Sequence, residues 1–255
     1  MTSDGRAGLK LCVAGAGPAY TDRPGAVGAA YLVRHGPDAM LLDLGQGAFT
    51  NLAGLIEPSS LAAVVISHLH PDHFIDLVPL RHYLRYEFEP PRRMRVIGPA
   101  GLGRRLDALH DQPGFAAAAL DLEDLAEGVR SVGPFALEAR RVRHTPDSHA
   151  FRVSVGGGPG LVYSGDCGAA EDLAPLIRAG DTLLAEATFG ADPVAPGSNH
   201  LNAHDLGHVA ARTGVARLLM THLLMGRDRE KAMTTAAAIA RVPVAFVDPG
   251  DRFEL

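Results

Sequence analysis

The chain has no tryptophan, only two cysteines and no long hydrophobic run among its 255 residues. Two cysteines cannot build a disulfide framework, which favours a reducing compartment. No apolar stretch approaches the roughly 20 residues that a membrane helix needs, which excludes a transmembrane span. The first ten residues also lack the apolar core of a secretory signal. We therefore expect a cytoplasmic protein with no membrane partner.

Positive charge is also in short supply. The 24 lysines and arginines are outnumbered by 29 acidic residues, which gives a formal net charge of −5. Such a chain has no global basic field, which argues against a general role in coating DNA or RNA. A local site for an anionic ligand stays open.

Nothing in the chain marks a domain boundary. There is no repeat and no low-complexity tract, and the glycine-rich stretch 156–160 separates two strand-like segments as a hairpin turn would. One domain of this length can bury about 70–75% of its unfolded surface. We predict a single domain over residues 1–255.

Strand-like segments dominate the first part of the chain, and helices and strands alternate in its last third. A run of β-branched residues predicts a buried strand at Leu61–Ser67, and the segment Asp72–Tyr86 is predicted as one helix. Another helix is expected at Ala203–Thr213, with Asn202 as N-cap and Gly214 at its C-terminal end. This order indicates two packed sheets with helices outside, an α/β sandwich.

Histidine is the residue that the chain has in excess, with 12 copies. The segment 68–73 follows the predicted buried strand and contains four possible metal ligands, which are His68, His70, Asp72 and His73. Side chains alternate along a strand, so His68 and His70 fall on one side, while Asp72 and His73 turn back from the next helix. Imidazole and carboxylate groups suit zinc and its first-row neighbours. The cluster therefore predicts two adjacent metal sites.

Further ligand types stand just after other predicted strands. These are His144, Asp166 and His222. Open α/β architectures place their sites at the C-terminal ends of strands, so we expect these residues to complete the metal sites.

The segment His68–His73 resembles the H-x-H-x-D-H signature of the metallo-β-lactamase superfamily. This resemblance spans nearly the whole chain and implies an αβ/βα four-layer sandwich that holds two divalent metal ions, Zn²⁺ or alternatively Mn²⁺. It assigns His68, His70 and His144 to the first ion. The second ion would take Asp72, His73 and His222, and Asp166 would bridge both.

Within the superfamily, the chain is similar to the tRNase Z-like phosphodiesterases. The turn Asp43–Gly47 resembles their D-x-G-E/Q-G motif, and 185–189 resembles H-E-A-T-F with Ala185 in place of histidine. The segment 200–203 resembles their H-S-T-A motif. This resemblance implies that His200 pairs with Asp72 as a proton relay and that Glu186 supports it.

Two departures separate the chain from bacterial tRNase Z. Only 21 residues lie between His144 and Asp166, which leaves no room for the long arm that grips tRNA. Cys167 also replaces the usual threonine. Relatives without the arm include cyclic-nucleotide phosphodiesterases, and relatives often form homodimers.

We expect a metal-dependent hydrolase that cleaves a small or cyclic phosphodiester through a hydroxide held between two metal ions. His200 is the candidate that protonates the leaving oxygen. The alternatives are a tRNase Z-type endoribonuclease acting on RNA, a lactonase or other carboxyl-ester hydrolase, and a metal-containing binding module without catalysis.

Other features invite a functional interpretation that we consider weaker. The segment Gly15–Gly17 lacks the third glycine of a dinucleotide fingerprint, and the pair His204 and His208 has no glutamate between its members. The arginines between Arg81 and Arg95 are expected on a solvated face. His149 and Cys167 are left without a predicted contact to substrate, and Cys167 is expected to be a small buried residue.

Overall fold

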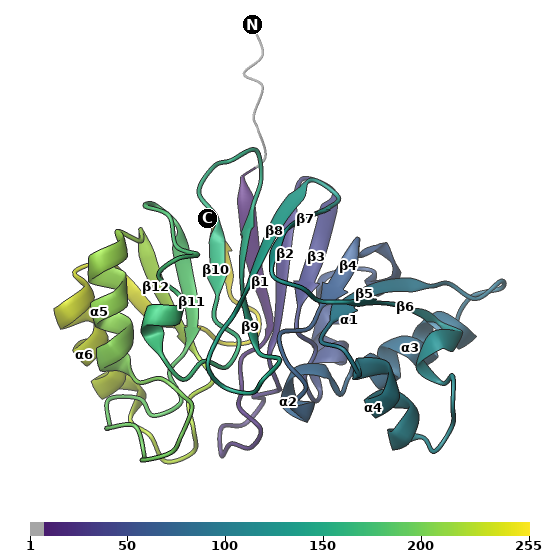
Figure 1. Ribbon diagram of the computed structural model, residues 1–255, viewed down its shortest axis with the longest axis horizontal. Helices are drawn as coiled ribbons and strands as arrows, with labels where there is room; N and C mark the ends of the chain where they lie inside the picture. The colour runs from purple at the N-terminus through teal and green to yellow at the C-terminus, as the bar shows by residue number, and fades with distance from the viewer. Residues whose placement is uncertain (1–7) are drawn as a thin grey trace, which may run out of the picture.

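The computed structural model describes residues 8–255, which form two sheets packed face to face (Figure 1). In spatial order, the first sheet contains β14 (Arg252–Glu254), β1 (Leu9–Gly15), β2 (Ala30–His35), β3 (Asp38–Leu42), β4 (Ala63–Val65), β5 (Met94–Gly98) and β6 (Leu120–Asp124). The second contains β13 (Val244–Phe246), β12 (Arg217–Thr221), β11 (Thr182–Glu186), β10 (Leu161–Tyr163), β9 (His149–Ser154), β8 (Phe135–Arg141) and β7 (Gly128–Val132).

Helices cover the outer face of each sheet. The first sheet carries α1 (Ala48–Leu55), α2 (Pro71–Phe74), α3 (Leu77–Tyr86) and α4 (Leu102–Leu109). The second carries α5 (Ala203–Thr213) and α6 (Arg229–Ala240). Three short 3₁₀ turns lie at Pro58–Ser60, Ala116–Ala118 and Ala170–Asp172. The layers therefore follow the order helix, sheet, sheet, helix, which confirms the predicted sandwich.

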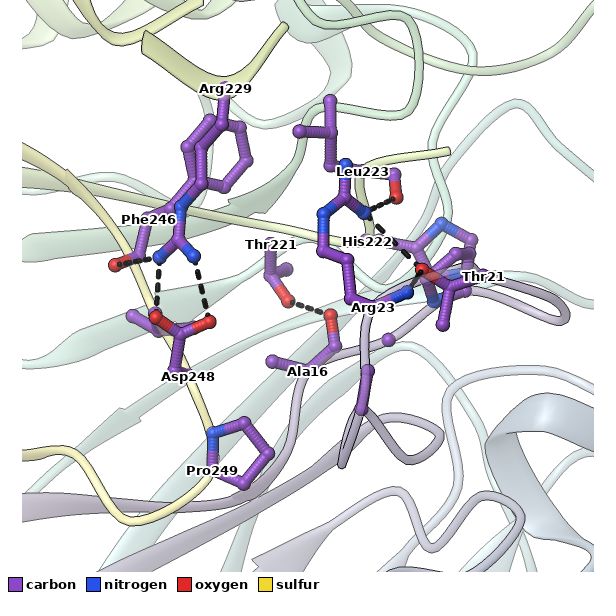
Figure 2. A pocket seen from close by; sticks show the side chains of 14 residues that line it. Ala16, Thr21, Arg23, Thr221, His222, Leu223, Arg229, Phe246, Asp248 and Pro249 are labelled. Atoms are coloured by element: carbon purple, nitrogen blue, oxygen red, sulfur yellow. Dashed lines mark hydrogen bonds and ion pairs between the residues drawn. The ribbon is translucent and has the colours of Figure 1, made fainter. Parts of the chain in front are cut away.

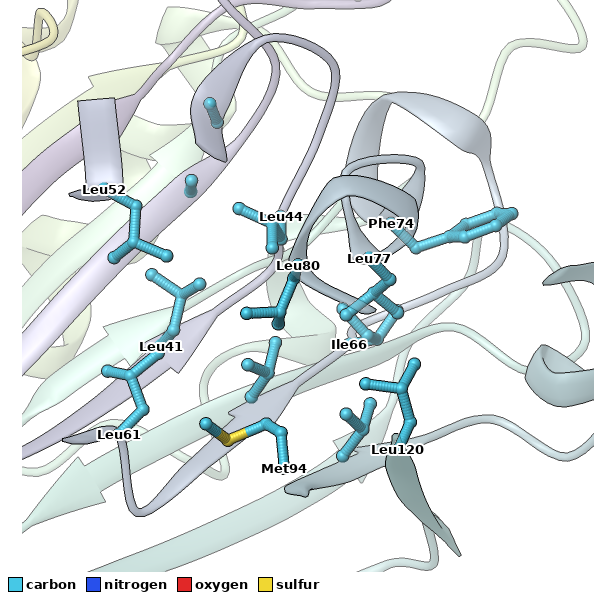
Figure 3. Packing of buried hydrophobic residues seen from close by; sticks show 14 of the residues in the cluster. Leu41, Leu44, Leu52, Leu61, Ile66, Phe74, Leu77, Leu80, Met94 and Leu120 are labelled. Carbon is cyan, nitrogen blue, oxygen red and sulfur yellow. The ribbon is translucent and has the colours of Figure 1, made fainter. Parts of the chain in front are cut away.

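Successive side chains along each strand point to opposite faces of the sheet, which gives each sheet an inner and an outer core. Leu11 of β1 and Phe151 of β9 point into the core between the sheets, whereas Cys12 points outward. The outer core of the first sheet joins Leu41 of β3 to Leu80 of α3 (Figure 3). Because each sheet buries both faces, its central strands are apolar at almost every position, as the segment Leu61–Ser67 indicated.

One predicted helix proved to be two. The segment Asp72–Tyr86 breaks between α2 and α3, where the backbone N–H of Asp76 donates to the Leu44 carbonyl at 3.1 Å. The Asp76 carboxylate also accepts from the Phe49 N–H at 2.9 Å. These long-range contacts stop α2 after one turn. By contrast, the bounds of α5 are those predicted, with Asn202 accepting from the Asp205 N–H and Gly214 at a φ of 72°.

No helix within residues 8–255 is long and apolar enough to cross a membrane. The prediction of a single domain over residues 1–255 stays a prediction, although both sheets contribute to the one core between them.

Candidate metal centre

The candidate ligands meet where strands of both sheets end, near α2 in Figure 1. The segment 68–73 follows β4, and Pro71 starts α2 with a fixed φ that suits the first turn of a helix. Asp166 and His222 follow β10 and β12, which run parallel on either side of β11. The carboxyl ends of parallel strands share one edge of the sheet, so these side chains converge.

The first donor group contains His68, His70, His144 and Asp166, whose ligand atoms lie within 4.8 Å of one another. His70 Nδ1 and His144 Nε2 are 3.1 Å apart. Asp166 Oδ2 lies 3.6 Å from His144 Nε2 and 3.7 Å from His68 Nε2. His70 is exposed, so this group faces solvent on one side.

The second donor group contains Asp72, His73, Asp166 and His222, and all four side chains are buried. Asp166 Oδ1 lies 3.3 Å from His73 Nε2 and 3.5 Å from His222 Nε2. Asp72 Oδ2 lies 3.2 Å from the same nitrogen of His222. Asp166 thus turns one oxygen to each group, which is the geometry that a bridging carboxylate needs. The structure brings all seven predicted residues together.

The donor atoms fit a pair of cations. Among the described residues, His68 Nε2, His73 Nε2 and Asp166 Oδ1 are buried without any hydrogen-bond partner. Buried polar atoms nearly always have one. Two imidazole nitrogens and a carboxylate oxygen gathered in one buried space are a donor set for divalent ions. The residues therefore fit the metal ions that the resemblance implied.

Asp43 orients His73 from behind. Its Oδ2 lies 2.7 Å from His73 Nδ1 and accepts hydrogen bonds from Ser67 Oγ and the Tyr163 hydroxyl, both also at 2.7 Å. Ser67 Oγ in turn lies 3.1 Å from His68 Nδ1. A proton held on Nδ1 of each ring leaves Nε2 free to bind a metal ion. The sequence had shown Asp43 only as part of a turn motif, and this role was missed.

The outer nitrogens of two other histidines are also engaged. His144 Nδ1 donates to the Asn199 carbonyl at 2.8 Å, and His222 Nδ1 lies 3.1 Å from Thr188 Oγ1. Neither Asn199 nor Thr188 was singled out from the sequence. Thr188 does lie in the segment that resembles H-E-A-T-F, which was the available signal.

For two residues of the centre, neighbouring charges shift the pKa in the direction opposite to that of burial. Burial would raise the pKa of Asp166, but the imidazoles of His222 and His73 hold this pKa well below its usual value. Burial would lower the pKa of His73, yet Asp166 and Asp43 raise it well above its usual value. For His68, burial and the neighbouring His73 outweigh the attraction of Asp166, so its pKa lies well below the ordinary range. The centre therefore keeps an ionised carboxylate at its middle.

His200 lies beside both donor groups but pairs differently from the prediction. Its Nδ1 is 3.0 Å from Glu186 Oε1 and 3.3 Å from Thr188 Oγ1. The expected pair with Asp72 is not among its contacts in residues 8–255, because Asp72 faces His222 instead. Glu186 stands at the end of β11, next to the loop that carries His200, and this adjacency decides the pairing.

Glu186 is held rigidly. It is buried and accepts hydrogen bonds from three backbone N–H groups, at Cys167, Thr188 and Leu201, over 3.0–3.2 Å. Its carboxylate therefore has a fixed position for His200.

The comparison with known proteins agrees with this geometry. Residues 37–223 match the family described as beta-lactamase superfamily domain. The chain belongs to this superfamily. Over 240 residues it is 32% identical to protein ML1173 of Mycobacterium leprae, covering 91% of this chain and 84% of that one. It is 27% identical over 204 residues to the probable metallo-hydrolase YhfI of Bacillus subtilis, covering 76% and 78%.

Several solved structures share the fold. The crystal structure of Bacillus subtilis YhfI matches with a TM-score of 0.86 at 22% identity, over 97% of this chain and 99% of that one. The short form of human tRNase Z matches with a TM-score of 0.74 at 20% identity, over 96% and 98%. A diphosphatase of the PhnP family also has a TM-score of 0.74, at 15% identity over 97% and 98%.

Ala185, which departs from the motif of the tRNase Z-like members, belongs to the outer core of the second sheet. Its side chain points into the outer core beneath α5 and α6, whereas Glu186 points to the opposite side. Successive side chains on a strand face opposite ways, so the exchange of histidine for alanine leaves the donor groups unchanged.

The remaining candidates have structural partners. Arg81 departs from the expected solvated face: it is buried, its Nε donates to the Phe115 carbonyl and its guanidinium lies over the Phe115 ring. Arg93 and Arg95 are more exposed and pair with Asp121 and Glu123 of β6. Cys167 is buried, and burial raises the pKa of its thiol, while His149 is buried with Nδ1 2.9 Å from the Asp147 carbonyl. His204 and His208 are exposed on α5.

The turn Gly15–Gly17 lies against the metal centre. The Ala16 carbonyl accepts hydrogen bonds from the His222 N–H and from Thr221 Oγ1, both at 3.0 Å. A Cβ on Gly15 would lie 1.9 Å from the Gly28 carbonyl oxygen, so no larger residue fits there.

Proposed function

We propose that this superfamily member is a dinuclear metal-dependent hydrolase whose substrate is a small or cyclic phosphodiester. The observation that supports this function is the pair of donor groups that share Asp166, with one oxygen turned to each. The names of two relatives, a probable metallo-hydrolase and a diphosphatase, agree with hydrolysis.

The donor types favour zinc, with manganese as the alternative. Five imidazoles and two carboxylates would hold the ions, namely His68, His70, His144 and Asp166 for the first and Asp72, His73, Asp166 and His222 for the second. When bound, such a pair lowers the pKa of water and polarises a phosphoryl group.

His200 is the proposed proton donor to the leaving oxygen. Its side chain is 22% exposed, whereas that of Glu186 is 1% exposed, so the imidazole stands between the buried carboxylate and the solvent. Glu186 holds the Nδ1 side, which leaves Nε2 for the substrate. General acid catalysis from such a position contributes about 10²–10⁴ in rate. Asp72 acts in this proposal as a ligand, and its catalytic effect follows from the metal ion that it holds.

The short segment between His144 and Asp166 favours a small substrate. There β9 and β10 form a plain antiparallel hairpin, so this part of the chain offers no surface for a large RNA. The likeness to human tRNase Z over 96% of the chain keeps an endoribonuclease as the second candidate.

A substrate panel tests the function. Protein loaded with Zn²⁺ or Mn²⁺ should hydrolyse bis(p-nitrophenyl) phosphate and at least one cyclic nucleotide, and Asp72→Ala should lose both metal and activity. Cleavage of a tRNA precursor at catalytic enzyme levels would instead favour the endoribonuclease. Turnover of a lactone alone would overturn the phosphodiesterase, and metal-loaded protein that hydrolyses nothing would favour a binding module. Cytoplasmic location and a homodimer stay predictions, which fractionation and light scattering can check.

A further inference from the structure

Two arginines line one small cavity behind His222. The cavity lies between the loop after β1 and the ends of β12 and β13, with Arg23 on one side and Arg229 on the other (Figure 2). Its volume of about 30 Å³ has room for water but not for a substrate group. We therefore assign both arginines a role in holding neighbouring protein segments and not in binding a ligand.

Arg23 binds the backbone that follows His222. Its Nη1 donates to the Leu223 carbonyl at 2.7 Å, and its Nη2 lies 3.3 Å from the Leu224 carbonyl and 3.5 Å from that of Arg227. A guanidinium is a rigid planar fork with five N–H donors, so one side chain can hold several carbonyl groups at once. Arg229 does not reach the backbone after His222: it pairs with Asp248 and donates to the Phe246 carbonyl at 3.1 Å.

His222 has a backbone conformation that needs support from its surroundings. Its φ of 58° lies in the left-handed region, which is unfavourable for a residue with a side chain. The Ala16 carbonyl holds the backbone at His222 itself, and Arg23 holds the carbonyl of the next residue. Both contacts come from the connection between β1 and β2 of the first sheet, whereas His222 follows β12 of the second.

We propose that Arg23 is a positioning residue that holds His222 in the conformation required by the second donor group, and thereby sets the affinity for the second metal ion. This inference rests on the ligand assignment under the proposed function. The first donor group is independent of Arg23, because none of the arginine's hydrogen bonds reaches a segment that carries its residues.

Zn²⁺ titration against a chromophoric chelator tests this role without measuring activity. Arg23→Ala should bind the first ion with wild-type affinity and the second about 10–100-fold more weakly, as is typical when the support of a ligand is lost. Arg23→Lys, which can reach fewer carbonyl groups, should lie between the two. Arg229→Ala is the matched control because it lines the same cavity, and it should bind both ions as the wild type does.

Three results would overturn the inference. Wild-type affinity of Arg23→Ala for both ions would remove the role of Arg23. Equal weakening of both ions would show a general loss of structure, and the thermal midpoint of the metal-free variant should then fall as well. Binding of only one ion by the wild-type protein would overturn the two-ion proposal and this inference with it. If Arg23→Ala does not fold, Arg23→Lys decides between these results.

Discussion

The two donor groups share Asp166 but differ in burial and in the way their residues are held. All four residues of the second group are buried, whereas His70 of the first is exposed and His144 is only partly buried. In the second group, His73 contacts the buried carboxylate of Asp43, and His222 contacts Thr188. In the first group, His144 contacts only a backbone carbonyl on its outer side, that of Asn199.

Under the proposed function, this difference separates two tasks within one centre. The exposed side of the first group gives a substrate access to the donors, and His200 stands at the same side, with its ring centroid 4.7 Å from that of His144. The second group is enclosed by segments from both sheets, and contacts between residues far apart in the sequence hold its ligands in place. We therefore expect substitutions to fall into three classes, which weaken metal binding by both groups, by neither group, or mainly by the second group.

Asp166→Ala should have the largest effect, because Asp166 is the one residue that contributes to both groups. We expect metal analysis to show the loss of both ions. Turnover should fall by about 10³-fold or more, since metal ions supply several kcal/mol of transition-state stabilisation. His204→Ala, an exposed change on α5, is the control and should keep both ions. Two bound ions in Asp166→Ala would disprove the bridging assignment.

His200→Ala should affect neither donor group yet slow the reaction. We expect turnover to fall about 10²–10⁴-fold, because the proposed proton donor is removed, while metal content stays at two ions per chain. Steady-state kinetics with metal analysis on the same sample checks both parts. Wild-type turnover would exclude His200 as the proton donor, and a loss of metal would make it a ligand.

Asp43→Asn should act mainly on the second group, because Asp43 contacts His73 directly and reaches His68 of the first group only through Ser67. An amide no longer offers His73 Nδ1 the charged acceptor at this position, so the second ion should bind about 10–100-fold more weakly. Tyr163→Phe is the matched control, since it removes one hydrogen bond to the same carboxylate and leaves His73 in contact. It should cost about 1 kcal/mol of stability and leave metal affinity unchanged. Equal effects of the two variants on Zn²⁺ titration would argue against an orienting role for Asp43.

Much of the donor set could be predicted because its signal is local. The residues 68–73 follow a buried strand within one short segment, so strand alternation and a proline turn suffice to bring their side chains together. His144, Asp166 and His222 also follow strands, and their placement at the ends of neighbouring strands needed only the rule for sites in α/β sheets. The layered fold follows from the same apolar pattern.

The residue types of the centre and the order of the strands that carry them can be read from the chain alone. Which groups hold those residues in place depends on how the two sheets pack. Asp43 meets Tyr163 from 120 positions away, Arg23 meets the Leu223 carbonyl from 200 positions away, and His200 pairs with Glu186 instead of Asp72. Such contacts form when two sheets pack together, and a single sequence carries no periodic pattern that records them.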